Sequence, residues 1–163
     1  ERLMGYAVDI TVPLLLTGKV VAISRRVLSG EIVAVQSAQN TLAQAFKVAV
    51  AKDMVHQLGL SSPRAMAFSR DVVTDSPFPA ALTNEFRASI STFADANKFQ
   101  IVSVLGSSEG NSGGGNIRSI GFYFGTDTTN SPGTGTLGSL VNTLNVAKDS
   151  SLEVTFQYEI TVG

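Results

Sequence analysis

The stretch Gly133–Gly138, GTGTLG, has the G-x-G-x-x-G spacing of a dinucleotide-binding turn. In that motif the glycines let a strand turn tightly into a helix whose N-terminal amides face a pyrophosphate, within a βαβ unit. Only 25 residues follow Gly138, and the last twelve of them have the pattern of one strand. We therefore interpret the glycines as serving the backbone of a wide loop between strands, and no nucleotide cofactor is predicted.

The sequence contains a single histidine, His56. A Ser-His-Asp site brings an activated serine, a base and an orienting acid together. Asp53 lies only three residues before His56 on a predicted helix, and neither Ser107 nor Ser108 has the G-x-S-x-G context of an activated serine. His56 is interpreted as an ordinary helix-surface histidine, and no catalytic residue is predicted.

Metal binding has little support in the residue types. One histidine and no cysteine remove the usual zinc sites. The segment TDTTN, residues 126–130, offers oxygen atoms, but Asp127 is its only charged residue, whereas good Ca²⁺ loops supply several carboxylates. We predict instead an Asx-type turn in which Asp127 and Asn130 bond their own backbone, and no metal site.

A pair of carboxylates could serve glycoside hydrolysis. Glu153 and Glu159 lie on the polar face of the predicted last strand, while Glu85 and Asp75 are far away in the sequence. No pair stands out, so the chain is predicted not to be an enzyme.

The composition favours a subunit of an assembly. Of the 163 residues 44% are hydrophobic and 15% are charged, against about 25% charged in ordinary soluble domains. The net charge is −1, and Arg25–Arg26 is the only basic cluster, so no nucleic-acid partner is predicted. The apolar stretch 7–23 is interrupted by Asp9, Pro13 and Lys19, so no membrane partner is predicted either.

The elements that would position these residues are mostly strands. Residues 6–27 predict two strands with a turn at Thr17–Gly18, and EIVAV at 31–35 predicts a third. From Asn40 to Leu58 the pattern is that of an amphipathic helix, capped by Asn40 and stopped by Gly59. Its apolar stripe recurs every four residues: Leu42, Phe46, Val50, Met54 and Leu58.

After the helix, residues 61–85 contain three prolines and are predicted to be an irregular connection. Residues 85–92 predict a strand or a short helix, 98–105 and 117–125 predict strands, 106–116 a glycine-rich loop, and 139–146 a strand or a helix. Residues 152–162 alternate strictly between apolar and polar side chains, which predicts a strand with one face on a core.

Together these elements predict a mainly β chain: a β-sandwich-like antiparallel core with one amphipathic helix, about residues 40–58, packed on its side. We expect a single domain over residues 1–163. Within it, residues 1–35 would form N-terminal strands, serving as an inter-subunit arm, and 36–163 the helix and the sandwich core.

Several short motifs between residues 36 and 162 occur in an order that resembles small virion proteins of tailed bacteriophages. The matching positions are Leu82 with Glu85, Ile117–Phe122, Gly135–Thr136–Leu137, Lys148, and Leu152–Val162. Two positions depart from the pattern: GFYFG stands where Leu-Phe is usual, and Arg87 lies one residue closer to Glu85. Residues 1–35 fall outside the resemblance.

The resemblance implies a non-enzymatic structural subunit of a tailed-phage virion, assembled in the host bacterial cytoplasm, in the tail, neck or fibre region. Its partners would be copies of itself and other virion proteins, without a small-molecule ligand. One alternative is a decoration protein that cements the capsid surface. Another is a carbohydrate- or receptor-binding β-sandwich module, although such sites need exposed aromatic platforms. The chain has no Trp, and Tyr6, Tyr123 and Tyr158 mostly alternate with core residues.

Overall fold

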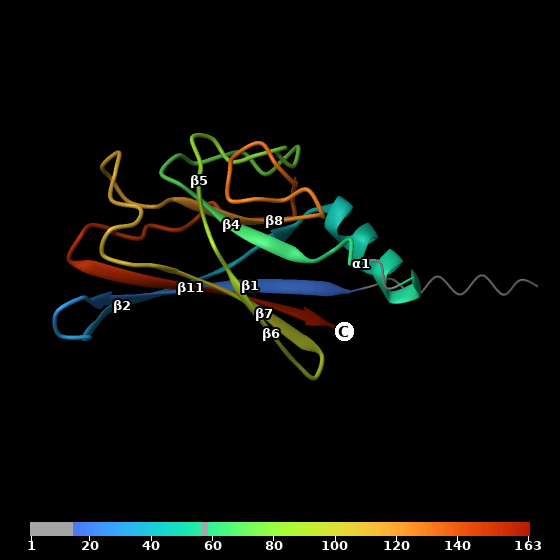
Figure 1. Ribbon diagram of the computed structural model, residues 1–163, viewed down its shortest axis with the longest axis horizontal. Coiled ribbons are helices and arrows are strands. Elements are labelled where there is room, and N and C mark those ends of the chain that lie inside the picture. Colours follow the sequence, from blue (N-terminus) through green and yellow to red (C-terminus); the bar gives the residue numbers. More distant parts are fainter. Residues whose placement is uncertain (1–14, 57–58) are drawn as a thin grey trace, which may run out of the picture.

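The computed structural model describes residues 15–56 and 59–163. They form two antiparallel sheets that face each other, with one helix at one end (Figure 1), so the predicted mainly β, sandwich-like fold is confirmed. The five-stranded sheet has the order β2-β1-β11-β7-β6. Its strands are β1 (Leu16–Arg26), β2 (Ile32–Gln39), β6 (Ser91–Asp95), β7 (Lys98–Leu105) and β11 (Leu152–Val162).

The four-stranded sheet has the order β5-β4-β8-β9, and a two-strand pair β10-β3 lies beside it. The strands of the larger group are β4 (Pro63–Ser69), β5 (Phe86–Ala88), β8 (Ser119–Phe124) and β9 (Thr136–Leu137). The pair consists of β3 (Thr41–Leu42) and β10 (Ser139–Leu140). The helix α1 spans Gln44–His56.

The main core lies between the two sheets and is rich in aromatic rings. Phe68 on β4 packs on Phe156 of β11 with ring centroids 4.8 Å apart, and Phe122 on β8 meets Tyr158 edge-on at 5.4 Å. The buried Tyr158 hydroxyl donates to the Ile120 carbonyl oxygen at 3.2 Å, which satisfies its polar end. Large, directional ring contacts of this kind set the spacing of the two sheets.

Strand β11 confirms its predicted pattern in full. Val154, Phe156, Tyr158 and Ile160 are buried, and the residues between them are half-exposed. The strand pairs with β1 along all eleven residues and with β7 along eight. It is therefore the central strand of its sheet.

The helix is shorter than predicted and is amphipathic over only part of its length. It begins at Gln44, and the expected cap Asn40 instead donates its side-chain amide to the Ser139 hydroxyl at 2.8 Å. Only Phe46 and Ala49 are buried in the helix, and the stripe residue Met54 is 67% exposed. Leu58 lies outside the described residues. The periodicity indicated a helix, but the sheets are long enough to cover only its first half.

The predicted turn at Thr17–Gly18 is wrong, because both residues lie inside β1, opposite Thr161 and Ile160 of β11. The N-terminal part of the expected two-strand unit lies outside the described residues. Since β1 sits between β2 and β11, this section of residues 1–35 belongs to the core sheet and not to a detached arm.

The proline-rich connection 61–85 hides a strand that the sequence reading missed. In β4 the run Ala65–Ser69 is completely buried, with β5 on one side and β8 on the other. Pro63 is tolerated because it is the first residue of the strand, where its missing N–H does not interrupt the ladder. The rest of 70–85 is irregular, as predicted.

The remaining predictions are largely confirmed. Strands β7 and β8 lie within the predicted ranges, residues 85–92 contain β5 and the start of β6, and residues 139–146 are extended and not helical. The glycine-rich segment 106–116 forms turns, and Arg70 donates to the carbonyl oxygens of Gly110 and Gly115, the latter at 3.1 Å.

Candidate functional site

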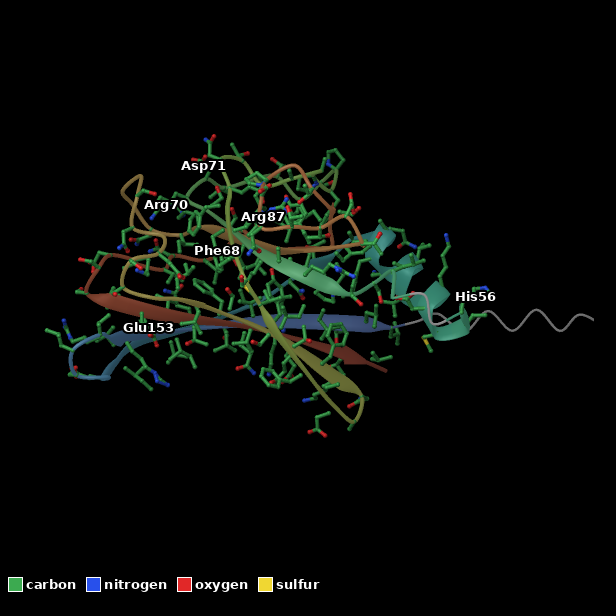
Figure 2. All side chains as sticks on the ribbon, in the orientation of Figure 1. His56, Phe68, Arg70, Asp71, Arg87 and Glu153 are labelled. Atoms are coloured by element: carbon green, nitrogen blue, oxygen red, sulfur yellow. The ribbon has the colours of Figure 1, made fainter. Side chains whose placement is uncertain are left out.

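The structure does not bring the nominal Ser-His-Asp residues together. His56 is exposed at the end of α1, near the Val162 end of β11, whereas Ser107 and Ser108 follow Leu105, which pairs with Val154. Those two ends of β11 are about 26 Å apart. Asp53 accepts hydrogen bonds from the backbone amides of Leu60 and Ser61, at 2.8 and 2.6 Å. Figure 2 shows His56 at one end of the molecule and Arg70, which binds the serine loop, toward the other.

The glycines of 133–138 serve the backbone. Gly135 has a φ of 73°, and a Cβ there would lie 2.2 Å from the Thr128 hydroxyl oxygen. A Cβ on Gly138 would lie 2.4 Å from the Phe122 ring. The stretch continues into β9 and β10 and not into a helix, so it offers a pyrophosphate no helix N-terminus.

The predicted Asx-type turn at 126–130 is wrong. The Asp127 carboxylate accepts from the Gly135 amide at 3.4 Å, and the Asn130 side-chain amide donates to the Ser89 hydroxyl at 2.9 Å. The Asp127 side chain therefore joins the two ends of the loop 125–135, and the Asn130 side chain fastens the loop to the segment after β5. Within residues 15–56 and 59–163, no three His, Cys, Asp or Glu side chains gather as metal ligands would.

The polar group with the most contacts is the clamp formed by Glu85, Arg87 and Tyr123. Glu85 and Arg87 point to one side of the chain because they are two residues apart in an extended segment, while Phe86 between them stacks on Phe68 in the core. The Arg87 guanidinium pairs with the Glu85 carboxylate at 3.3 Å and lies 3.7 Å from the centre of the Tyr123 ring. The Tyr123 hydroxyl donates to Glu85 at 3.0 Å.

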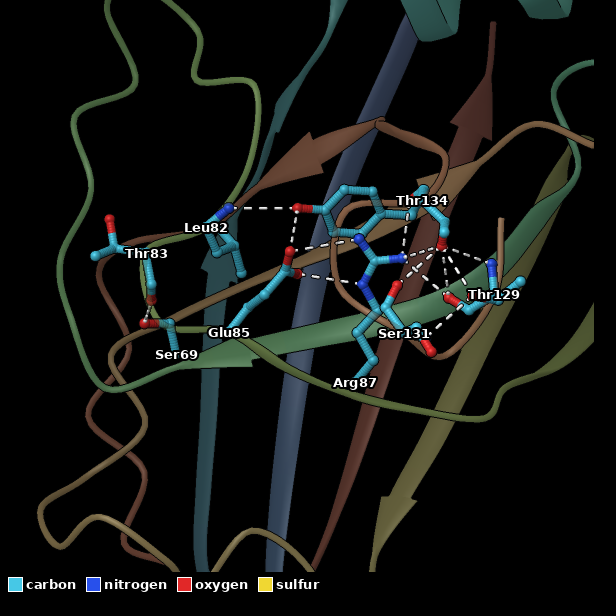
Figure 3. Close-up of polar contacts among 9 residues, drawn as sticks. Ser69, Leu82, Thr83, Glu85, Arg87, Thr129, Ser131 and Thr134 are labelled. Atoms are coloured by element: carbon cyan, nitrogen blue, oxygen red, sulfur yellow. Dashed lines mark hydrogen bonds and ion pairs between the residues drawn. The ribbon is translucent and has the colours of Figure 1, made fainter. Parts of the chain in front are cut away.

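The clamp holds the loop 125–135 against the four-stranded sheet. Arg87 donates to the carbonyl oxygens of Thr129 and Thr134, at 2.9 and 2.8 Å, and to the Thr134 hydroxyl at 3.1 Å. Figure 3 shows the guanidinium between Glu85 on one side and Thr129 and Thr134 on the other. The loop is tied to β5 by hydrogen bonds from one charged side chain.

The charged side chains of the clamp are shielded from solvent. The side chain of Arg87 is 0% exposed and that of Glu85 is 5% exposed. Burial, and next the charge of Glu85, raise the pKa of Tyr123 to about 12, so its phenol stays protonated near neutral pH. A buried, mutually satisfied ion pair of this kind fastens neighbouring segments to each other.

Lys148, one of the positions of the resemblance, is likewise structural. It is buried, and its ammonium donates to the Asn111 side chain at 2.6 Å and to the Asp149 carbonyl oxygen at 2.9 Å. Burial lowers the pKa of Lys148. The contact ties the glycine-rich segment to the turn before β11.

Exposed apolar side chains lie on the outer face of the five-stranded sheet, which is the face turned away from the four-stranded sheet. In one row across this face stand Val35, Ile23, Thr155 and Val104, one from each of four neighbouring strands. Val35 is 60% exposed and Val104 is 44% exposed. The next row holds Val21, Gln157 and Val102, all half-exposed, so these two rows form a strip that is apolar apart from Thr155 and Gln157 of β11.

Charged residues border this apolar strip at one end. Glu159 lies between Lys19 and Lys98, at 3.5 and 3.3 Å, and the hydrogen bond from Lys98 lowers the pKa of Glu159. In the part of the chain that the structure describes, no element covers the strip, as the lower side of the molecule in Figure 1 shows. An apolar centre with a polar rim is the usual arrangement of a protein–protein interface.

The sequence alone does not reveal the clamp. It presents Glu85 as an isolated carboxylate and a motif position, Arg87 as a motif position, and Tyr123 as a residue that alternates with the core, because nothing in their spacing indicates Thr134 as a neighbour. The row on the outer face depends on the register of four strands. Both described tyrosines are buried, as their alternation predicted, so they offer a sugar no stacking platform. Tyr6 lies outside the described residues.

The helix in the described ranges, α1, is not long and apolar enough to cross a membrane. Comparison of the chain with protein-family models, with curated proteins and with solved structures finds no match in any of the three.

Proposed function

We propose that the chain is a non-enzymatic structural subunit that associates with copies of itself through the outer face of the five-stranded sheet. The observation that carries the proposal is the row Val35, Ile23, Thr155 and Val104, which no element of the described chain covers. Contiguous exposed apolar surface on a soluble chain marks an interaction site.

The size of this face supports the proposal. Five strands spaced about 4.8 Å apart, over about eight residues each, make a surface of about 600 Å². A stable interface buries about 800 Å² per partner, so the face and its rim supply an area of the right order. A face that binds its own copy is self-complementary, and a symmetric assembly uses it in every subunit.

The assembly that we propose is a tailed-phage particle, with the subunit in the tail, neck or fibre region. This part rests on the resemblance of residues 36–162 alone. The clamp supports the non-enzymatic part, because the most elaborate polar group of the described chain is sealed inside the protein.

The test is the mass of the purified full chain, by light scattering or mass photometry over a wide concentration range. We expect a discrete oligomer whose population rises with concentration. The double variant Val35→Lys with Val104→Lys should raise its dissociation constant at least tenfold. The control is Val72→Lys, because Val72 is 56% exposed but lies in the loops over the other sheet. A chain that is monomeric at every concentration, or an oligomer that ignores the valine substitutions, contradicts the proposal.

The symmetry of the oligomer separates the two particle positions. Rings or trimers about a single axis fit a tail, neck or fibre component. Attachment to local three-fold or six-fold axes of a capsid fits the decoration alternative.

A further inference from the structure

An open apolar groove lies at the end of the sandwich between α1 and the β6–β7 hairpin. Its volume is about 570 Å³, and its apolar lining includes Val50, Met54, Ala94, Ala96, Phe99 and Val162. Among the described residues, Lys98 is the only charged one that lines the groove, and its ammonium pairs with Glu159 at 3.3 Å. The groove is therefore suited to an apolar segment.

The groove exists because the apolar side of α1 extends past the core that the described residues form. Val50 and Phe99 still touch the main core, but Met54 is 67% exposed and projects beyond it. The amphipathic stripe predicted for 40–58 thus continues past the point where the chain's own core ends. An apolar helix face is normally buried, so the exposed part of this face is suited to packing against a further segment.

The next feature is the free edge of the five-stranded sheet. β6 is the last strand in the order and pairs only with β7, and all five of its residues are exposed. Ala94 belongs both to this strand and to the groove. An extended segment that enters the groove can pair with the β6 backbone and place alternate side chains against α1.

The chain itself contains a segment of this chemistry. Residues 3–14, LMGYAVDITVPL, are apolar except for one charge at Asp9, and Val8, Ile10 and Val12 alternate as strand residues do.

The segment also leaves the described chain at the groove. The carbonyl oxygen of Leu15 accepts from the Gly163 amide at 3.0 Å, and Leu16 pairs with the groove residue Val162. Fourteen extended residues reach up to about 46 Å, which is enough to arrive at a neighbouring molecule.

We propose that the groove binds residues 3–12 of a second copy, added as a strand along β6 with its apolar side chains against Met54 and Phe99. A second copy is favoured over the same chain because Val12–Leu16 contains no Gly, Asn or Asp for a tight reversal, and Pro13 holds the residue before it extended. This inference rests on the proposed self-association and assigns it a second contact.

The absence of cysteine from the chain permits a site-directed test. Met54→Cys in the full chain is labelled with a benzophenone maleimide, mixed with ¹⁵N-labelled wild-type chain, irradiated and mapped by mass spectrometry. The matched control is Val55→Cys, one residue further along α1, which is 74% exposed but does not line the groove. We expect adducts from position 54 on the ¹⁵N-labelled tryptic peptide 3–19, at least tenfold more abundant than from position 55.

Adducts only on the unlabelled peptide of the same chain, or equal yields from positions 54 and 55, overturn the inference. So does the absence of adducts on residues 3–14 in a sample that light scattering shows to be oligomeric, and that result leaves the outer-face proposal standing. A sample that is monomeric at all concentrations overturns the proposed function as well.

A second full-length variant checks the same contact without a label. Val8→Asp with Ile10→Asp places two charges on the apolar side of the segment, and we expect at least a tenfold weaker association. The urea midpoint, measured at a concentration where the chain is monomeric, should be unchanged. Association equal to that of the wild type overturns the inference. Removal of residues 1–30 is unsuitable, because it would delete the whole of the core strand β1.

Discussion

The outer faces of the two sheets differ in whether other parts of the described chain cover them. The loops 70–85 and 125–135 cover the four-stranded sheet, where a second small core forms and the Arg87 clamp closes over it. This core consists of Ala67, Val73, Leu82, Tyr123, Leu137 and Leu140. The five-stranded sheet has no such cover in the described chain, yet it bears Val35 and Val104 on its outer face.

The difference is informative because both faces belong to one chain. Where this protein hides an apolar sheet face from water, it uses long loops and a buried ion pair to do so. Where it leaves one open, apolar residues stay exposed between charged neighbours. The contrast supports a partner for the open face, and the same reasoning applies to the groove at α1.

The largest expected effect is at the clamp. Arg87→Ala leaves the Glu85 carboxylate buried without its cation, and breaking a buried pair in this way costs about 3–5 kcal/mol. The measurement is urea unfolding followed by circular dichroism. The control is Arg26→Ala, because the Arg26–Glu31 pair is exposed and contributes less than about 1 kcal/mol.

A double variant sharpens this prediction. Arg87→Met with Glu85→Gln removes both charges, so we expect it to be more stable than Arg87→Ala alone. If Arg87→Ala lowers the free energy of unfolding as little as Arg26→Ala does, contacts other than the clamp hold the loop.

The next effect compares the covered face with the open one. Leu82 is 5% exposed beneath the loops, so Leu82→Ala should lower the free energy of unfolding by about 2–5 kcal/mol. Val35→Ala on the open face should change it by less than about 0.5 kcal/mol. Both values come from denaturant unfolding at a concentration where the chain is monomeric. A costly Val35→Ala under those conditions would mean that the open face is packed within one chain.

The smallest expected effect is the pH dependence of stability that arises from Tyr123 beneath the covered face. The pKa of Tyr123 is raised to about 12 by burial and by Glu85, while an unfolded tyrosine titrates near 10. Between about pH 10 and 12 the unfolded chain loses a proton that the folded chain keeps, so stability falls as the pH rises through this window. The pKa of the buried Tyr158 is also raised, and it acts in the same direction.

Tyr123→Phe isolates the contribution of Tyr123. We expect a shallower decline of the urea midpoint between about pH 10 and 12 than in the wild type, with the remaining decline due to Tyr158 and other groups that titrate there. Tyrosinate absorbance gives an independent reading, because the buried phenols should ionise only as the protein unfolds. Identical slopes in the two proteins would contradict a buried Tyr123.

Local pattern alone determined much of the fold. The strict alternation over 152–162 predicted β11 to the residue, since one face of that strand meets the core and the other meets water. The apolar runs on either side of the glycine-rich segment 106–116 placed β7 and β8. The spacing of apolar residues also indicated one helix, because Phe46 and Ala49 fall on one side of it.

Other features were decided only by the tertiary structure. Two features concealed β4 in the sequence. Pro63 argues against a strand, and a strand that is buried on both faces shows no alternation of apolar and polar residues. The length of α1 and the exposure of Met54 depend on how far the sheets extend beneath the helix. The clamp joins Arg87 to Thr134 across 47 positions of sequence, and the row on the outer face depends on strand register between β2, β1, β11 and β7. Residue types record which side chains avoid water, whereas contacts between distant segments exist only once the chain has folded.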